Sequence, residues 1–257
     1  MTRFQDWPRK LYKRGGGDAL VHYTVFGKGP ATFELTTDYR TSGIPKGVEI
    51  VLQTKQQAPD SFSIAHEGPI GAELDRTPAL AKAIRAQNDC VRLQGEVKDP
   101  SSLNYMRDTI GLITWLLDEG CVGVLDILSF KWWSREEWRK SVFEPGQPSP
   151  RRHVVILVSD DGDETEWFHT RGMRKFGRPD ISIRFVPPQY REAITQLCNR
   201  FIEMQALGAI IPEGQEITMQ GLPAGMRAHH WGSHDDPAFN NAHVEIAWPG
   251  KKRLGPL

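Results

Sequence analysis

The chain has 257 residues, with 32 basic and 32 acidic side chains and therefore a formal net charge of zero. Hydrophobic residues make up 39% and charged residues 25%, an ordinary balance for a water-soluble globular protein. The zero charge argues against a nucleic-acid partner and against an anionic membrane surface, because no overall positive field would attract either. No apolar run approaches the roughly 18 residues of a transmembrane helix, and we expect neither a membrane partner nor a secretory signal.

The three cysteines indicate a reducing compartment. Cys90, Cys121 and Cys198 are odd in number and far apart, whereas a disulfide framework would be even and denser. Each lies among apolar neighbours, where cysteine behaves as a small buried hydrophobe. We therefore expect a cytoplasmic protein with inert thiols.

The first 65 residues differ in pattern from the rest of the chain. Strands are predicted at residues 21–26, 32–37 and 48–54, separated by short glycine or proline breaks. Residues 58–71 show no clear period and are interpreted as a connector. We expect residues 1–65 to form an N-terminal β-rich segment packed on a main α+β domain of residues 66–257.

Helices and strands are mixed from there on. Helices are predicted at residues 77–87, 100–118, 135–143 and 188–207, and strands at 90–97, 122–128, 153–159, 166–170, 181–186, 215–219 and 243–248. The helices at 100–118 and 188–207 each show one apolar stripe, so each should pack a single face on a sheet. Without strict alternation of strand and helix, the pattern favours an α+β fold, with a mixed, mainly antiparallel sheet and helices packed on one face.

A histidine-rich stretch offers possible metal ligands. His229, His230, His234 and Asp235 lie within seven residues of one another, and imidazole with carboxylate suits zinc or iron. The spacing from His230 to His234 joins two imidazoles only on a helix, and Gly232 argues for a loop. A solvated, turn-rich loop is therefore the favoured interpretation, with neither metal nor cofactor bound.

A second cluster is acidic and contains Asp160, Asp161, Asp163 and Glu164. Such oxygen ligands can hold calcium, but the order departs from the calcium-loop pattern. Asp161-Gly162 between two strands is typical of a hairpin turn, and we expect a turn here.

Two segments combine aromatic or basic side chains in a way that suits a protein partner. Trp132, Trp133 and Trp138 lie beside cations, and tryptophan and arginine are enriched among interface hot spots. A glycine-broken loop carries four cations, Arg171, Arg174, Lys175 and Arg178. The alternatives are that the tryptophans belong to the core and that the loop is a glycine-shaped connection with solvated charges. We take these seven residues as the candidate partner-binding surface, with an acidic protein as the partner, and assign no catalytic residue.

The same loop carries a resemblance. The string His169-Thr170-Arg171-Gly172-Met173, followed by Phe176-Gly177-x-Pro179-Asp180, resembles a shared motif of a group of uncharacterised bacterial domains. The segment from Leu116 to Asp126 is similar to the same group, and the likeness covers residues 70 to 220. That group is associated with toxin–immunity gene neighbourhoods, which implies a binding protein rather than an enzyme.

Two classes of function remain. The first is a cytoplasmic protein-interaction module, with the resemblance implying an immunity-type inhibitor of a cognate bacterial toxin. The second is a metal-dependent hydrolase built on the cluster from His229 to Asp236. The absence of a recognisable catalytic motif favours the first.

Overall fold

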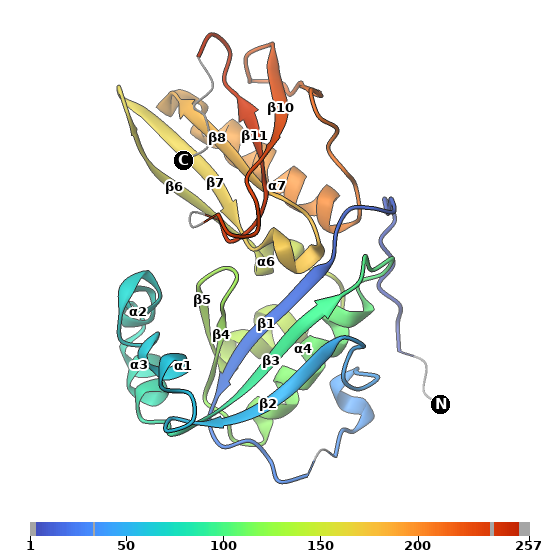
Figure 1. The fold of residues 1–257 in the computed structure, drawn as a ribbon, viewed down its shortest axis with the longest axis vertical. Coiled ribbons are helices and arrows are strands. Elements are labelled where there is room, and N and C mark those ends of the chain that lie inside the picture. The colour runs from blue at the N-terminus through green and yellow to red at the C-terminus, as the bar shows by residue number, and fades with distance from the viewer. Residues whose placement is uncertain (1–3, 33, 237–238, 252–257) are drawn as a thin grey trace. The chain divides into compact units, whose positions relative to one another are not determined.

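The computed structural model describes residues 4–32, 34–236 and 239–251 (Figure 1). It contains 31% helix and 28% strand in one antiparallel and one mixed sheet, which confirms the α+β class. The chain splits into two compact units, the first made of Met1–Pro8 and Leu20–Arg152 and the second of Arg9–Ala19 and His153–Leu257.

The expected boundary at residue 65 falls inside the first unit. Strand β1 (Ala19–Phe26) pairs with β4 (Gly123–Asp126), and β2 (Val48–Thr54) pairs with β3 (Asp89–Val97). The N-terminal strands therefore share a sheet with strands that follow them by tens of residues, and they do not form a separate layer.

The first unit contains a five-stranded sheet of order β2-β3-β1-β4-β5, with β5 at Lys131–Ser134. Its helical segments are η1 (Thr37–Tyr39), α1 (Pro59–Ser63), α2 (Gly68–Asp75), α3 (Pro78–Arg85), α4 (Asn104–Asp118), α5 (Arg135–Trp138) and η2 (Arg139–Phe143). Ser134 and Glu137 form the capping box that the sequence predicts before α5. A strand is expected at 32–37, but residues 32 and 34–36 belong to no strand and Thr37 begins η1. Residue 33 lies outside the described residues.

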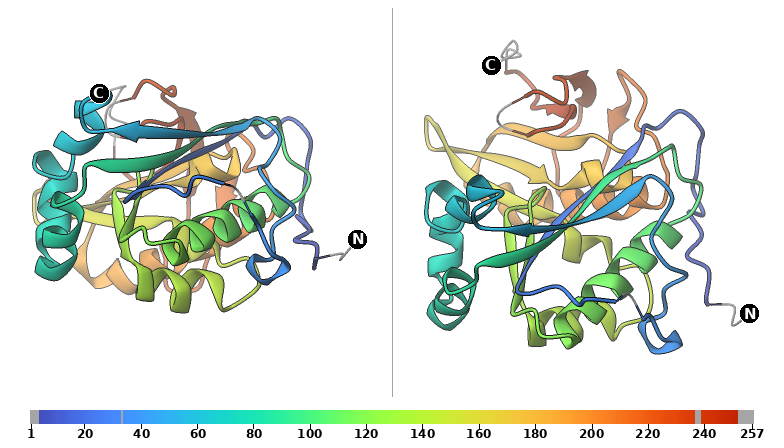
Figure 2. Two further views of the ribbon diagram at one scale, coloured as in Figure 1. Left: turned by 90° about the horizontal axis from the view of Figure 1, so that it is seen from below. Right: turned by 60° about the horizontal axis from the view of Figure 1, so that its bottom comes forward.

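Helix α4 is buried around its whole circumference, so the prediction of a single packed face is wrong for it. Figure 2 shows it lying along the strands of the first sheet. Its two threonines are satisfied within the helix: Thr109 Oγ1 donates to the Tyr105 carbonyl and Thr114 Oγ1 to the Ile110 carbonyl, both at 2.8 Å. Such internal bonds allow a helix with polar residues to be enclosed.

The presumed connector at 58–71 is helical and completes a hydrophobic core. Phe62 of α1 and Leu74 of α2 pack with Phe26, Ile84 and Trp132 in one buried cluster. The short helices carry too few turns for their period to be read from the sequence, which explains why they are missed.

The second unit contains a six-stranded sheet of order β6-β7-β8-β11-β10-β9. Its elements are α6 (Pro150–His153), β6 (Val155–Gly162), β7 (Thr165–Arg171), η3 (Met173–Phe176), β8 (Asp180–Val186), η4 (Pro188–Tyr190), α7 (Arg191–Ala206), β9 (Glu216–Ile217), β10 (Met226–Trp231) and β11 (His243–Ala247). The β8–β11 pair is parallel, whereas the pairs β6–β7, β7–β8, β10–β11 and β9–β10 are antiparallel.

Helix α7 covers one face of this second sheet. Its apolar residues Ile194, Leu197 and Phe201 pack against Phe168 of β7 and Ile183 of β8, as the predicted stripe requires. Since successive strand residues point to opposite faces, the neighbours of Phe168 point away from α7. Among the described residues, no helix combines the length and apolarity needed to cross a bilayer.

The acidic cluster forms the β6–β7 hairpin, as expected, but the turn lies two residues later than Asp161-Gly162. Asp163 and Glu164 occupy the turn with φ values of 50° and 57°. Asp161 is used elsewhere, because its carboxylate accepts bonds from Arg184 Nε and the Phe185 backbone N–H.

Candidate functional site

The string of the basic loop that carries the resemblance, residues 169–180, builds a tight connection between β7 and β8. Gly172 and Gly177 flank η3 with φ values of 119° and 60°, in the region that glycine tolerates best. A Cβ on Gly177 would lie 2.2 Å from the Gly17 carbonyl oxygen, so a side chain here would collide with backbone. Both glycines therefore serve the fold, as the structural alternative predicts.

Asp180 is the centre of this connection. It is fully buried, and its Oδ1 accepts bonds from Thr170 Oγ1 at 2.8 Å and from the Met173 N–H at 3.2 Å. Its Oδ2 accepts from Asn241 Nδ2 at 2.8 Å. Burial raises the pKa of Asp180 to about 6, and these bonds and the nearby Arg171 oppose that rise. The threonine and the aspartate of the string are thus explained by one hydrogen-bonded network.

Arg178 serves the C-terminus of α7 and does not form a free binding fork. Its Nε donates to the Ala209 carbonyl and its Nη2 to the Gly208 carbonyl, at 3.0 and 2.8 Å. Arg9 donates to the Ala206 and Gln205 carbonyls of the same helix end. Two guanidinium groups therefore satisfy the last carbonyls and complement the negative end of the helix dipole.

The four cations of the basic loop do not form an exposed surface, because three of them are buried. Arg171, Lys175 and Arg178 are 4%, 0% and 2% exposed, so neither a partner-binding role nor solvated charges fit these three side chains. Arg174 is partly exposed and donates to the Asn240 carbonyl. The loop offers a partner one partly exposed cation instead of four.

The three tryptophans of the candidate surface belong to the core of the first unit. Trp132, Trp133 and Trp138 are 8%, 4% and 0% exposed. Trp132 Nε1 donates to the Ile70 carbonyl, and Trp138 Nε1 donates to Thr114 Oγ1. The core alternative therefore describes these three side chains.

The histidine cluster does not converge on a metal. His229 and His230 lie on β10, where the sequence favoured a loop; His229 Nδ1 donates to Glu213 and His230 Nε2 to the Ile211 carbonyl, both at 2.7 Å. His234 and Asp235 are exposed in the following loop. Within the part of the chain that the structure describes, no three histidine, cysteine or acidic side chains are grouped as a metal site requires.

Sequence reasoning missed an aromatic and imidazole cluster on the sheet face opposite α7. Trp167 stacks on His169 at 4.2 Å between ring centroids, and Phe239 stacks on His243 at the same distance. Trp167 Nε1 donates to Ser182 Oγ. The alternation of Trp167 and His169 along β7 is a signal that could have found half of this cluster, whereas Phe239 arrives from a distant loop.

We expect His169 to make the second unit sensitive to acid. Burial lowers the pKa of His169 to about 4, with help from Arg171, Arg184 and His243. As pH falls from the ordinary value of 6.5 towards 4, the unfolded chain takes up a proton that the folded chain does not, so stability is lost in that window. The loss attributable to His169 is at most about 3 kcal/mol.

The measurement is urea unfolding of the wild type and His169→Phe between pH 7 and pH 4. Asp180, whose pKa is raised, gains stability on acidification where His169 loses it. Both proteins contain Asp180, so the difference between their free energies of unfolding reports on the histidine. The wild type should lose stability relative to the variant on acidification. A difference that stays constant with pH would contradict this assignment.

The edge strand β6 of the second unit exposes two neighbouring apolar side chains. Leu157 and Val158 are 40% and 42% exposed although they are adjacent and point to opposite faces. Leu157 lies opposite His169 and Val158 opposite Phe168 in the β7 ladder. The sequence predicts this strand, but its position at the sheet edge depends on pairings that a local pattern does not contain.

The chain matches no protein-family model, no curated protein and no solved structure.

Proposed function

We propose that the chain is a protein-interaction module that takes up an extended strand of its partner along the free edge of β6. The observation that carries the proposal is the exposure of Leu157 and Val158 at that edge. On one side β6 pairs with β7, and on the other no strand of the described residues follows it. Its outer backbone groups and two apolar side chains together support strand addition.

Edge strands are commonly protected against such pairing by charges, bulges or short length. In β6 the charges and the register shift are confined to the hairpin end, around Asp160 and Gly162. The four residues Val155–Val158 carry neither charge nor proline. An eight-residue strand whose first half is unprotected fits an interface better than an ordinary edge.

The same geometry describes the partner. Its strand would place one apolar side chain beside Leu157 and the next beside Val158, on opposite faces of the extended sheet. Exposed Asp160, Asp163 and Glu164 at the hairpin end favour basic residues in the partner. This replaces the acidic partner expected from the basic loop, whose cations are largely buried.

The resemblance to domains of toxin–immunity neighbourhoods supports a bacterial toxin as that partner, and an immunity-type inhibitor as the role. A cytoplasmic location belongs to the same proposal. It is supported by the three cysteines, which are buried and unpaired. Burial raises the pKa of Cys90 to about 11 and of Cys121 and Cys198 to about 12, so reactive thiolate is scarce at neutral pH.

We expect the double variant Leu157→Lys/Val158→Lys to lose its partner while remaining folded. Two lysines at the edge oppose strand addition, and exposed substitutions usually change stability by less than about 0.5 kcal/mol each. Wild type and variant serve as baits in extracts of the native host, followed by titration of each protein that they retain. Affinity should fall at least about tenfold.

The matched control is Leu52→Lys on β2, an edge strand of the other sheet whose Leu52 is 52% exposed. It should retain the partner. An equal loss of affinity in both variants would indicate non-specific hydrophobic binding, and β6 would then not be the partner-binding edge. A wild-type dimer that the β6 variant converts to a monomer would replace the foreign partner by a second copy of this chain.

A further inference from the structure

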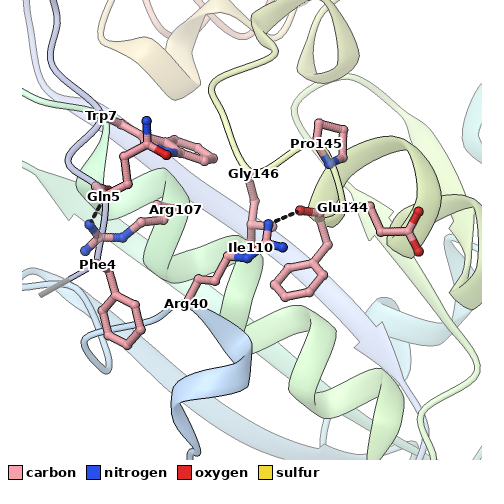
Figure 3. A pocket seen from close by; sticks show the side chains of 10 residues that line it. Phe4, Gln5, Trp7, Arg40, Arg107, Ile110, Glu144, Pro145 and Gly146 are labelled. Atoms are coloured by element: carbon pink, nitrogen blue, oxygen red, sulfur yellow. Dashed lines mark hydrogen bonds between the residues drawn. The ribbon is translucent and has the colours of Figure 1, made fainter. Parts of the chain in front are cut away.

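The first unit contains a cavity of about 390 Å³ that the proposed interaction does not use (Figure 3). Its walls combine apolar and polar side chains and come from four segments far apart in the sequence. Trp7, Ile110, Phe143 and Pro145 provide much of the lining. A volume of this size, with apolar side chains beside several polar ones, suits a small-molecule site.

One of the two arginines at the cavity is already engaged. Arg107 is 7% exposed, and its Nε and Nη2 donate to Asp108 Oδ1 at 3.1 and 2.8 Å. Its Nη1 donates to the Gln5 carbonyl and its Nη2 also to Ser42 Oγ. This paired guanidinium holds the wall of the cavity, and its charge is balanced by Asp108.

Arg40 is different, because it is held in place but only partly bonded. Its guanidinium lies over the Phe143 ring, 4.6 Å from the centroid, and Nη1 donates to the Phe143 carbonyl at 2.9 Å. A Cβ on Gly146 would lie 2.8 Å from Nη1, so glycine allows this approach. Nε and Nη2 have no hydrogen-bond partner among the described residues, which leaves one side of the fork open.

The backbone supports the same fixed position. Arg40 ends η1 with φ 52° and ψ 29°, a left-handed conformation that is uncommon for arginine. Such conformations often occur where the surrounding structure positions a functional side chain. Since the stacked ring, the carbonyl bond and the backbone restrict the guanidinium, little entropy remains to be lost when an anion binds.

We propose that this cavity binds a small organic carboxylate, with the carboxylate on Arg40 Nε and Nη2 and the apolar body against Trp7, Ile110 and Phe143. Two N–H groups on one side of a guanidinium match the two oxygens of a carboxylate. A phosphate would bring a further charged oxygen towards apolar walls, at a desolvation cost. In Figure 3 the Glu144 carboxylate points away from Arg40, so it leaves this place open.

The test is calorimetric titration of the full chain with octanoate and with octanamide, which share one body and differ in the head group. Octanoate should bind, and octanamide should bind at least about tenfold more weakly, because a charged hydrogen bond is lost. In Arg40→Gln the affinity for octanoate should fall by about the same factor, so that the preference for the acid disappears.

The matched control is Arg139→Gln, because Arg139 also lies over the Phe143 ring, at 5.7 Å, but is paired with Asp118. It should bind octanoate like the wild type. Urea unfolding of both variants shows whether each is folded, and octanoate-dependent shifts of wild-type Ile110 methyl signals report occupancy without any variant. Absence of octanoate binding to the wild type, or equal binding by Arg40→Gln, would overturn the proposal.

Discussion

The Asp180→Ala variant is expected to lose about 3 kcal/mol or more of the free energy of unfolding of the second unit. The substitution leaves three buried donors unpaired, on Thr170, Met173 and Asn241. Each unpaired donor costs about 1–3 kcal/mol. Removing the buried charge returns part of this, since the pKa raised to about 6 means that the ionised carboxylate is itself costly. The lost bonds outweigh that relief.

Urea unfolding at pH 7.5, followed by circular dichroism, measures the loss. Asp180→Asn retains one acceptor oxygen and should lie between wild type and the alanine variant. Asp235→Ala, an exposed aspartate of the same unit, should change stability by less than about 0.5 kcal/mol. If Asp180→Ala and Asp235→Ala unfolded at the same urea concentration, Asp180 would not be the centre of the β7–β8 connection.

This network shows how far sequence reasoning reaches at the basic loop. The glycines and the flanking strands are predictable, because Gly172 and Gly177 adopt positive φ between two alternating segments. The burial and the partners of the cations are not predictable, because Arg178 donates to the carbonyls of Gly208 and Ala209, some thirty residues later. A local run of arginines looks the same in a sequence whether it is solvated or caps a helix.

The interpretation of the histidine-rich stretch as one loop is wrong for His229 and His230 for a related reason. Residues 232–236 are correctly interpreted as a turn-rich region, but His229 and His230 belong to β10, whose register is set by β11. Strand pairing separates neighbouring side chains to opposite faces, and a count of ligands in a window ignores this. Once His229 and His230 are placed on β10, the four candidate ligands no longer form one cluster.

The longer elements were predictable because their hydrophobic period repeats several times. Helix α7 and strands β3, β8 and β11 lie close to their predicted ranges. The arrangement of the strands in two sheets was not predictable, since β1 pairs with β4 about one hundred residues away. The cavity was not predictable either, because the residues that line it, Trp7, Arg40, Ile110 and Phe143, come from segments far apart in the sequence.

The Trp138→Ala variant should destabilise the first unit by about 3–5 kcal/mol, as large-to-small changes of buried tryptophan do. Trp138 is completely buried, and its ring makes edge contacts with Tyr23 at 6.0 Å and Trp133 at 6.1 Å between centroids. It joins α5 to α4 through the bond from Nε1 to Thr114 Oγ1, 3.0 Å long. Removing it therefore empties a site shared by β1, β5 and both helices.

Trp138→Phe separates packing from hydrogen bonding in this site. Phenylalanine retains much of the ring volume beside Tyr23 but cannot donate to Thr114, so we expect a smaller loss of about 1–2 kcal/mol. Thermal and urea unfolding, followed by circular dichroism, measure both variants against the wild type. If Trp138→Ala cost less than Trp138→Phe, or less than about 1 kcal/mol, the indole would not be a core residue and its role as an exposed anchor for a partner would have to be restored.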